Sequence, residues 1–421
     1  MNTEDNQRLT RVGPGTPMGE LQRRYWQPAL LSEELPGPDC PPVRVRLLCE
    51  DLVAFRDTDG GVGLVDAYCP HRRAPMFFGR NEERGLRCVY HGWKFDRAGI
   101  CVDMPSEPPD SLFKTKVKIA AYPTHEAGGI VWTYMGPPEK QPPVPDYEFL
   151  RAPATHRHVS KAFEDCNWLQ SLEGGIDTSH SSWVHNMDIT IKSELRQRDG
   201  APRLDVEPTD YGFRYAGLRY GTDKCYARIY HYVMPAQQLR GGVTAIGGGL
   251  REVPSLHGHI WVPIDDEHTW AFNWLYSYDP KIPISHDHAI QLETYSGRGP
   301  DDFLPRTYQL KRNKTNDYLI DRQLQKTKTF SGIKGINTQD FAIQEGMGPI
   351  CDRTKEHLGT SDRAIIAARQ LLFEALKVVE AGGEPRGANS QLYRNVRAVD
   401  LEIPKDSQWQ EALREELVAR F

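Results

Sequence analysis

The feature that most constrains this chain is a pair of short motifs, each with a cysteine and a histidine within three residues of each other. The segment CPH at 69–71 is followed, after sixteen residues, by CVYHGW at 88–93. Thiolate and imidazole groups are common ligands of zinc and of iron–sulfur clusters. Two loops facing each other would offer two sulfur and two nitrogen atoms, so the fold must bring these loops together.

Two kinds of metal group suit this ligand set. Zinc would take all four ligands tetrahedrally, whereas a Rieske [2Fe–2S] cluster would place Cys69 and Cys88 on one iron and His71 and His91 on the other. Residue types alone do not separate the two. The spacing C-x-H and C-x2-H-G-W departs from the C-x2-C spacing of zinc sites and favours the cluster. Trp93 is then expected to pack against the cluster, with an ordinary core tryptophan as the alternative.

The region around these motifs, from about 25 to 135, is predicted to form many short strands separated by glycine. One hairpin turns at Asp59-Gly60 and another at Ala98-Gly99, where glycine supplies the positive φ that tight turns need. A proline-rich segment at 135–149 is typical of a linker. We therefore expect an all-β domain at 25–145, preceded by an extension at 1–24, and a second domain at 150–421.

A second cluster of chemically active residues lies at 164–185, where the sequence has a helical pattern with an unusual interior. On a helix, Glu173, Asp177 and His180 would share one face, an expensive arrangement unless something binds there. Gly174 and Gly175 each weaken a helix by about 1 kcal/mol relative to alanine. Their presence indicates a close backbone approach or a deliberate distortion.

His185 follows His180 by five residues, which is about 140° around a regular helix. Both rings can reach one metal only if the helix ends or bulges between them. Two histidines and one carboxylate form the facial triad of Fe(II) oxygenases, which leaves coordination positions open. The carboxylate must come from elsewhere: Asp340 is the candidate, with Glu345 and Asp352 as rivals that spacing cannot separate.

The remaining part of the second domain mixes element types. Alternating apolar and polar residues between about 203 and 278 predict long antiparallel strands with one face toward a core or cavity. His257 and His259 share a face of one strand and could contact a substrate, although ordinary sheet histidines are the alternative. Near the C-terminus, Ser361 or Asp362 is expected to cap a helix that ends at Gly382-Gly383.

Composition narrows the classes of partner. The formal net charge is −5, which provides no attraction to nucleic acid or to an anionic membrane. No apolar run approaches the roughly 20 residues that span a bilayer. The polar, acidic first residues do not form a signal peptide, and the eight cysteines are dispersed along the chain. We therefore expect a cytoplasmic protein with reduced thiols and with neither nucleic acid nor membrane as a partner.

Together the two cysteine–histidine motifs and the run NW-x-Q-x2-EGG-x-D-x2-H-x4-H resemble the α subunits of Rieske non-heme iron ring-hydroxylating oxygenases. The phthalate 4,5-dioxygenase-like branch is the most similar, since VGPGTPMGELQRRYWQPALL and QDFAIQEGMGPICDRTKEHLG also match it. The resemblance covers nearly the whole chain. It implies an α+β protein, with an all-β Rieske domain followed by a catalytic domain of the helix-grip type built on an antiparallel sheet.

The resemblance also implies roles for individual residues. His180 and His185 bind the mononuclear Fe(II), and Asp340 is selected as the third ligand with Glu345 behind it. Asp177 corresponds to the catalytic aspartate that links an iron-bound histidine to a Rieske histidine, here His91, of a neighbouring subunit. The family's pattern therefore predicts a homotrimer or a stacked pair of trimers.

The activity implied by the resemblance is hydroxylation, as cis-dihydroxylation, of an aromatic carboxylate such as a phthalate isomer or a substituted benzoate. O2 is the co-substrate, and a flavin and iron–sulfur reductase supplies electrons from NAD(P)H. A carboxylate needs a cation, for which Arg203 and Arg228 are candidates, and Asn167 is a polar neighbour of the iron. Alternatives are an O- or N-demethylase or monooxygenase, a Rieske electron carrier, and a zinc-stabilised ligand-binding protein.

Overall fold

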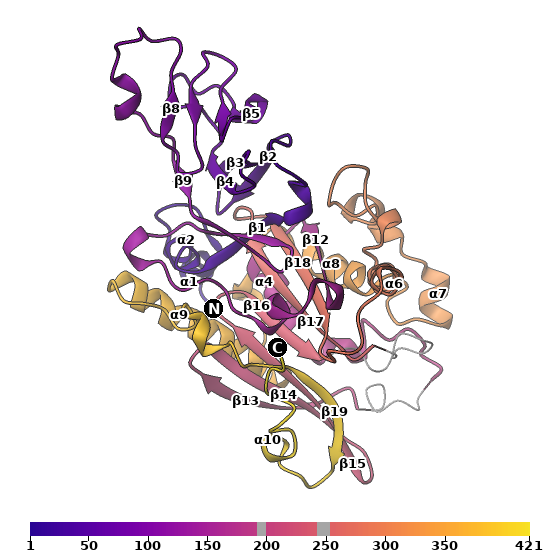
Figure 1. Cartoon of the computed structure of the whole chain (residues 1–421). Helices are drawn as coiled ribbons and strands as arrows, with labels where there is room; N and C mark the ends of the chain where they lie inside the picture. Colours follow the sequence, from indigo (N-terminus) through magenta and orange to yellow (C-terminus); the bar gives the residue numbers. More distant parts are fainter. Residues whose placement is uncertain (192–198, 242–252) are drawn as a thin grey trace. The chain divides into compact units, whose positions relative to one another are not determined.

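The computed structural model describes residues 1–191, 199–241 and 253–421. The chain divides into two compact units, one of Val12–Val144 and the other of Met1–Arg11 together with Pro145–Phe421. Figure 1 shows the N-terminal unit in indigo and purple, and the larger unit from magenta to yellow except for its first residues, which are indigo. The first residues thus belong to the larger unit, whereas the sequence-based limits of 25–145 and 150–421 remain predictions.

Three small antiparallel sheets make up the N-terminal unit. Their strands, in sheet order, are β1 (Trp26–Leu31), β11 (Ile130–Tyr134) and β10 (Thr124–Ala127); β2 (Val43–Leu47), β3 (Glu50–Arg56), β4 (Val62–Asp66) and β9 (Ala121–Tyr122); and β5 (Arg80–Glu82), β6 (Gly85–Arg87), β7 (Lys94–Phe95) and β8 (Cys101–Asp103). The helix α2 (Pro17–Gln22) precedes them. Both expected hairpin turns are confirmed, with φ of +85° at Gly60 and +77° at Gly99.

An eight-stranded antiparallel sheet forms the centre of the larger unit. Seven strands follow the order β12 (Arg157–Glu164), β18 (Thr269–Ser277), β17 (Ser255–Pro263), β16 (Gln237–Gly241), β15 (Lys224–Val233), β14 (Gly212–Tyr220) and β13 (Arg203–Thr209), and β19 (Val399–Pro404) pairs with β15. The long strands expected between 203 and 278 are confirmed. The expected helix at 164–185 is wrong at both ends, because β12 includes Glu164 and the helix is shorter.

The described part of the larger unit also contains eight α-helices. They are α1 (Thr3–Thr10), α3 (Glu148–Arg151), α4 (Trp168–Ile176), α6 (His286–Ser296), α7 (Arg322–Thr327), α8 (Ile336–Gly346), α9 (Arg363–Glu380) and α10 (Trp409–Ala412). Helix α4 packs on β16 and β17 and also against α8, while α9 lies along β13 and β14 (Figure 1). The mixed architecture confirms the α+β expectation. Among the described residues, every helix is too short or too polar to cross a bilayer.

The boundaries of α9 follow from local chemistry. Asp362 is its N-cap residue, as expected, although its carboxylate accepts from the Gly359 N–H at 2.7 Å and makes no capping bond to the helix. At the other end the chain turns at Gly382, where φ is +78°. The seven buried residues of α9, among them Ile365, Leu372 and Leu376, recur at helical spacing and form the face that packs inward.

Candidate metal centres

Helix α4 begins at a buried cap and stops short of the histidines. The Asn167 side chain accepts from the Leu169 N–H at 3.1 Å, and its amide donates to the carbonyls of Thr10 and Asp266 at 2.9 and 2.7 Å. Its side-chain groups are therefore occupied in holding α4 to its neighbours. The structure does not place Asn167 on the cavity beside the histidines, so the role expected for it beside the iron finds no geometric support.

The chain leaves the helix before the first histidine. Asp177 is the C-cap residue, with φ −74° and ψ 123°, and its carboxylate accepts from the N–H groups of Ser179 and His180 at 2.7 and 3.3 Å. A 3-10 turn at His180–Ser182 follows. The sequence predicted that the helix ends or bulges between the two histidines, whereas in the structure it ends at Ile176, upstream of both. Sequence reasoning placed Glu173 on the same face, but its carboxylate instead binds Arg353 and Arg369.

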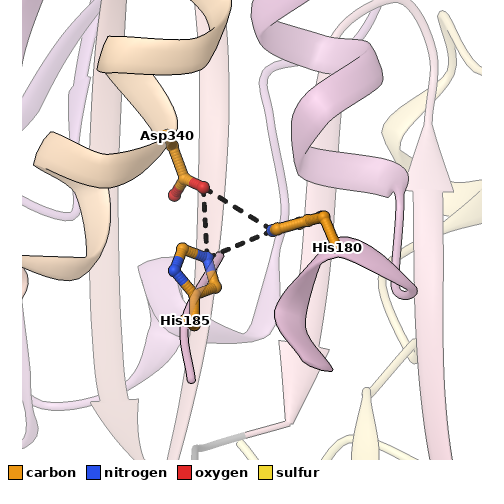
Figure 2. A group of neighbouring side chains, drawn as sticks. All are labelled: His180, His185 and Asp340. Atoms are coloured by element: carbon orange, nitrogen blue, oxygen red, sulfur yellow. Dashed lines mark hydrogen bonds and ion pairs between the residues drawn. The ribbon is translucent and has the colours of Figure 1, made fainter. Parts of the chain in front are cut away.

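His180, His185 and Asp340 converge from three segments of the chain (Figure 2). The Nε2 atoms of the two rings are 3.1 Å apart, and Asp340 Oδ1 lies 3.1 Å from His185 Nε2 and 3.6 Å from His180 Nε2. Asp340 comes from the middle of α8, which packs against α4. The structure therefore brings together the two histidines of the facial-triad pattern and Asp340, the carboxylate that the resemblance selected.

The two rival carboxylates lie elsewhere. Glu345 accepts from the Tyr318 hydroxyl and from the Asp165 N–H, and Asp352 caps a short turn by accepting from the Thr354 N–H at 3.2 Å. Neither joins the two histidines in the described structure.

The surroundings of the Nδ1 atoms of His180 and His185 show that the site suits a cation. His185 Nδ1 lies 2.7 Å from Gln339 Oε1, an acceptor, so this nitrogen carries the hydrogen. His180 Nδ1 lies 3.4 Å from Asp177 Oδ2. Each ring then presents an Nε2 lone pair to the other and to Asp340, and three mutually facing acceptors repel unless a cation lies among them. The donor set thus fits a divalent iron with open positions.

Electrostatics keep the acidic groups of this site ionised. Burial opposes ionisation of Asp340, but the neighbouring His185 and His180 outweigh it and hold the pKa of Asp340 below its usual value. Burial also opposes ionisation of Asp177, yet its interactions with His180 and with backbone N–H groups lower its pKa. Asp177 in turn raises the pKa of His180 against the effect of burial. Both carboxylates are therefore charged near neutral pH.

The triad opens into a cavity between the sheet and the helices α4 and α8. Its walls combine apolar groups, among them Trp261, Ile336 and Phe341, with the cationic side chains of Arg228 and Arg240. The two glycines of α4 make this packing possible: a Cβ on Gly175 would lie 2.0 Å from the Trp261 ring. A Cβ on Gly174 would lie 2.0 Å from Gln344 Nε2. Of the two explanations for this glycine pair, close approach is the one the structure supports.

The three relevant arginines differ in position and in charge compensation. Arg203 is exposed on β13 and is not among the residues that line the cavity. Arg228 is buried, lines the cavity and lies 3.5 Å from the buried carboxylate of Asp400. Arg240, on β16, also lines the cavity, and its Nε is buried without a hydrogen bond to any described residue. Burial and the nearby Arg228 lower the pKa of Arg240 to about 10.

Sequence reasoning missed Arg240 because nothing local distinguishes it. It ends the segment PAQQL-R at 235–240, and an arginine in a strand is as consistent with a solvent-facing side chain as with a cavity. What identifies it is the register of the sheet, which pairs Arg240 with His257 on β17. The cavity histidine among the two candidates is His259, which is buried and hydrogen-bonds Asn273 at 2.7 Å.

The cysteine–histidine loops of the N-terminal unit have matching backbone turns. The Cys69 N–H donates to the Ala74 carbonyl and the Cys88 N–H donates to the Trp93 carbonyl, both at 2.8 Å. Both thiols are buried, and the rings of His71 and His91 are 4.5 Å apart. The two loops therefore face each other as the motif spacing requires.

Trp93 packs against one side of the cysteine–histidine cluster formed by Cys69, His71, Cys88 and His91. Its ring stacks on His71 with centroids 4.3 Å apart and an angle of 12°, and its Nε1 donates to Ser106 Oγ at 3.0 Å. Such packing shields the ligand ring from water, in agreement with the predicted role of Trp93.

Three observations show that this set fits a [2Fe–2S] cluster. Burial, together with the adjacent Cys88, raises the pKa of the Cys69 thiol to about 11, so a nearby cation is needed to hold this sulfur as a thiolate. His91 Nδ1 is buried and has no hydrogen-bond partner among the described residues. Tyr90, beside it, is 53% exposed, so the histidine loop reaches the surface. Two thiolates and two imidazoles are the Rieske ligand set.

Comparisons with known proteins agree with both centres. Residues 25–123 match the family model described as Rieske [2Fe-2S] domain, and 133–418 match that described as LigXa C-terminal domain like. The phthalate 4,5-dioxygenase oxygenase subunit of Pseudomonas putida is 41% identical over 98% of this chain and 94% of its own. The 3-chlorobenzoate-3,4-dioxygenase oxygenase subunit of Comamonas testosteroni is 39% identical, over 97% of each chain.

Two solved structures share the fold at low sequence identity. NdmA of Pseudomonas putida CBB5 has a TM-score of 0.62 at 18% identity, over 96% of this chain and 99% of its own. Dicamba monooxygenase bound to dicamba has a TM-score of 0.60 at 20% identity, over 86% and 99%.

Proposed function

The chain belongs to the family of Rieske non-heme iron oxygenase subunits, and we propose that it hydroxylates an aromatic carboxylate, most simply by cis-dihydroxylation. The observation that carries the proposal is Arg240, a cavity-lining cation without a described counter-ion, in the same cavity as His180, His185 and Asp340. A cation that lacks a protein partner needs an anion from its ligand.

The chain's own residues would position the substrate. The Arg240 guanidinium offers parallel N–H donors that match a carboxylate, and such a pair fixes orientation as well as affinity. Trp261, Ile336 and Phe341 supply an apolar surface suited to a ring. When bound, the mononuclear iron supplies the oxygen chemistry and the Rieske cluster supplies electrons one at a time. His180, His185 and Asp340 would hold the iron, and Cys69, Cys88, His71 and His91 the cluster.

The names of related proteins support this substrate class. The two relatives described above act on phthalate and on 3-chlorobenzoate according to their names. A second candidate, O-demethylation, is favoured by the 5,5'-dehydrodivanillate O-demethylase oxygenase subunit of a Sphingobium species, 33% identical over 92% of this chain and 83% of its own. Both reactions use the same protein ligands.

We further propose the partners that this activity requires. A flavin and iron–sulfur reductase would supply electrons from NAD(P)H, and the proteins would meet in the cytoplasm. Asp177, held against His180, also lines a surface hollow bordered by the exposed apolar side chains of Ile343, Met347 and Leu358. We propose that this hollow receives the His91 loop of a neighbouring subunit, within a homotrimer or a stacked pair of trimers.

The test is a product assay with the purified protein. The holoprotein is supplied with NADH, O2 and a surrogate reductase and offered benzoate, 3-chlorobenzoate, phthalate and 3-methoxybenzoate. Dihydroxylation is expected to yield a cis-dihydrodiol that has gained both oxygen atoms of O2 and two hydrogen atoms, whereas demethylation of 3-methoxybenzoate would release formaldehyde. Electron transfer into the protein without consumption of O2 or of any aromatic acid would contradict both reactions and support a carrier.

A further inference from the structure

We infer that the cavity selects substrates with a single negative charge, so that an aromatic monocarboxylate binds more tightly than a dicarboxylate of the same shape. This inference rests on the proposed function and specifies its substrate class. The basis of the inference is the pairing of the charged side chains that line the cavity.

The charges nearest the triad balance without a substrate. Asp177 and Asp340 both line the cavity and bring two carboxylate groups to its metal end. A divalent metal held by His180, His185 and Asp340 brings two positive charges. The metal end of the cavity is therefore electrically neutral and creates no demand for a further anion.

The first cavity arginine is also compensated. Arg228 Nε lies 3.5 Å from Asp400 Oδ2, and both side chains are 5% exposed or less. The register of the sheet fixes this pair, because Arg228 on β15 lies directly opposite Asp400 on β19. The two buried opposite charges on adjacent strands compensate each other, although Arg228 Nε makes no hydrogen bond to a described residue, and Arg228 then needs no carboxylate from a ligand for charge balance.

Arg240 is the cation that remains. It forms no hydrogen bond or ion pair with any described residue, and the nearby cationic Arg298 is already bound by Glu293 at 2.9 Å. The adjacent His257 and His259 are neutral, because burial and the surrounding arginines hold their pKa values far below 6.5. Among the described residues the cavity thus presents one uncompensated positive charge.

Two of the hydrogen-bond donors that line the cavity are already used within the protein. The Gln238 amide already donates to the Gly175 carbonyl at 2.6 Å and to the Tyr215 hydroxyl at 2.7 Å. The Ser181 hydroxyl donates to the Thr178 carbonyl at 2.8 Å. Because the described residues of the cavity provide one uncompensated cation, a dicarboxylate would bury its second charge without a counter-ion, which is unfavourable.

The experiment compares ligands of nearly equal shape and different charge. Isothermal titration calorimetry of the anaerobic holoprotein, at about pH 8 where carboxyl groups are ionised, would measure the dissociation constant of each ligand. Phthalate would be compared with phthalamate, and isophthalate with 3-carbamoylbenzoate. In each pair a carboxamide replaces one carboxylate, so size is conserved and one charge is lost. We expect each singly charged ligand to bind at least tenfold more tightly than its doubly charged partner.

Variants identify the group responsible. Arg240→Gln is expected to abolish the preference for benzoate over benzamide, whereas Arg240→Lys retains it and shows that the cavity still folds. Arg203→Gln, which removes an exposed cation outside the cavity, serves as the matched control and should bind benzoate as the wild type does. A wild-type protein that binds phthalate more tightly than phthalamate overturns the single-charge inference alone. Failure of every aromatic acid to bind overturns the proposed function as well.

Discussion

At the scale of single residues, the two histidines of the proposed iron site face different groups through their Nδ1 atoms. His180 Nδ1 faces the carboxylate of Asp177, whereas His185 Nδ1 faces the neutral amide of Gln339. The Gln339 amide cannot flip, because its Nε2 donates to the Ile333 carbonyl at 2.7 Å and lies 3.4 Å from Met187 Sδ. Gln339 therefore fixes which nitrogen of His185 is free to bind metal.

This geometry leads to a prediction about metal retention. Gln339→Leu leaves the buried His185 N–H without an acceptor, which costs about 1–3 kcal/mol and frees the ring to rotate. We expect the affinity of the metal-free protein for Co²⁺, followed by its visible absorption, to fall by about 10–100-fold. Gln339→Glu, which restores an acceptor, should recover most of it. Equal affinity in wild type and Gln339→Leu would contradict the orienting role.

Asp177 provides a second prediction at this scale. In Asp177→Asn the carboxylate that faces His180 Nδ1 is lost, while none of the predicted metal ligands changes. Both metal groups should remain bound at wild-type stoichiometry, and turnover should be nearly abolished. Metal analysis combined with single-turnover absorption of the reduced protein measures both quantities. Oxidation of the cluster at the wild-type rate in the variant would show that Asp177 takes no part in electron transfer.

At the scale of secondary structure, buried histidines make the central sheet sensitive to acid. On β15, His231 Nε2 donates to the Arg397 carbonyl at 2.9 Å, so its Nδ1 accepts from the Tyr211 hydroxyl at 2.7 Å and the ring is neutral. Burial lowers the pKa of His231 to about 3. Because the unfolded chain binds a proton below about pH 6.5, stability is fully present above that pH and falls as the pH drops toward 3.

Titration of His231 is predicted to lower the free energy of unfolding by up to about 1.4 kcal/mol for each pH unit as the pH falls from about 6 to 4. His231→Gln can keep both hydrogen bonds without a titrating group, and its stability should depend less on pH in that window. Urea unfolding of the two metal-free proteins, compared pH by pH, isolates this contribution from that of the other histidines. Parallel curves would contradict it.

The elements also show where prediction from the sequence stops. Spacing alone indicated that the chain must break its helix for His180 and His185 to meet, because a 140° separation is a property of any regular helix. It could not place the break at Ile176, since that depends on Asp177 accepting backbone N–H groups. The strands from 203 to 278 were predictable from alternation, whereas the position of Arg240 in the cavity depends on the register of β16 and β17.

At the scale of the whole molecule, the two metal centres belong to different units of the chain. The ligand sets were recognisable from the sequence because each is local, apart from Asp340, which lies far from its partners in sequence and was selected by resemblance. The sequence contains no comparable local motif from which the assembly of several copies of the chain could be predicted. This assembly depends on which surface meets the hollow beside Asp177, so it calls for an experiment on the assembly.

Mixing two inactive variants tests whether catalysis crosses the boundary between subunits. His91→Ala removes a predicted cluster ligand and Asp177→Asn removes the carboxylate beside His180, so each homo-oligomer should be inactive. If His91 of one copy serves Asp177 of the next, co-expression with two affinity tags yields mixed oligomers in which some junctions carry both native residues. These oligomers, purified on both tags, should recover a substantial fraction of wild-type oxygen consumption. Mixed oligomers as inactive as their parents would contradict transfer between subunits, because no wild-type chain is present to provide a route within one copy.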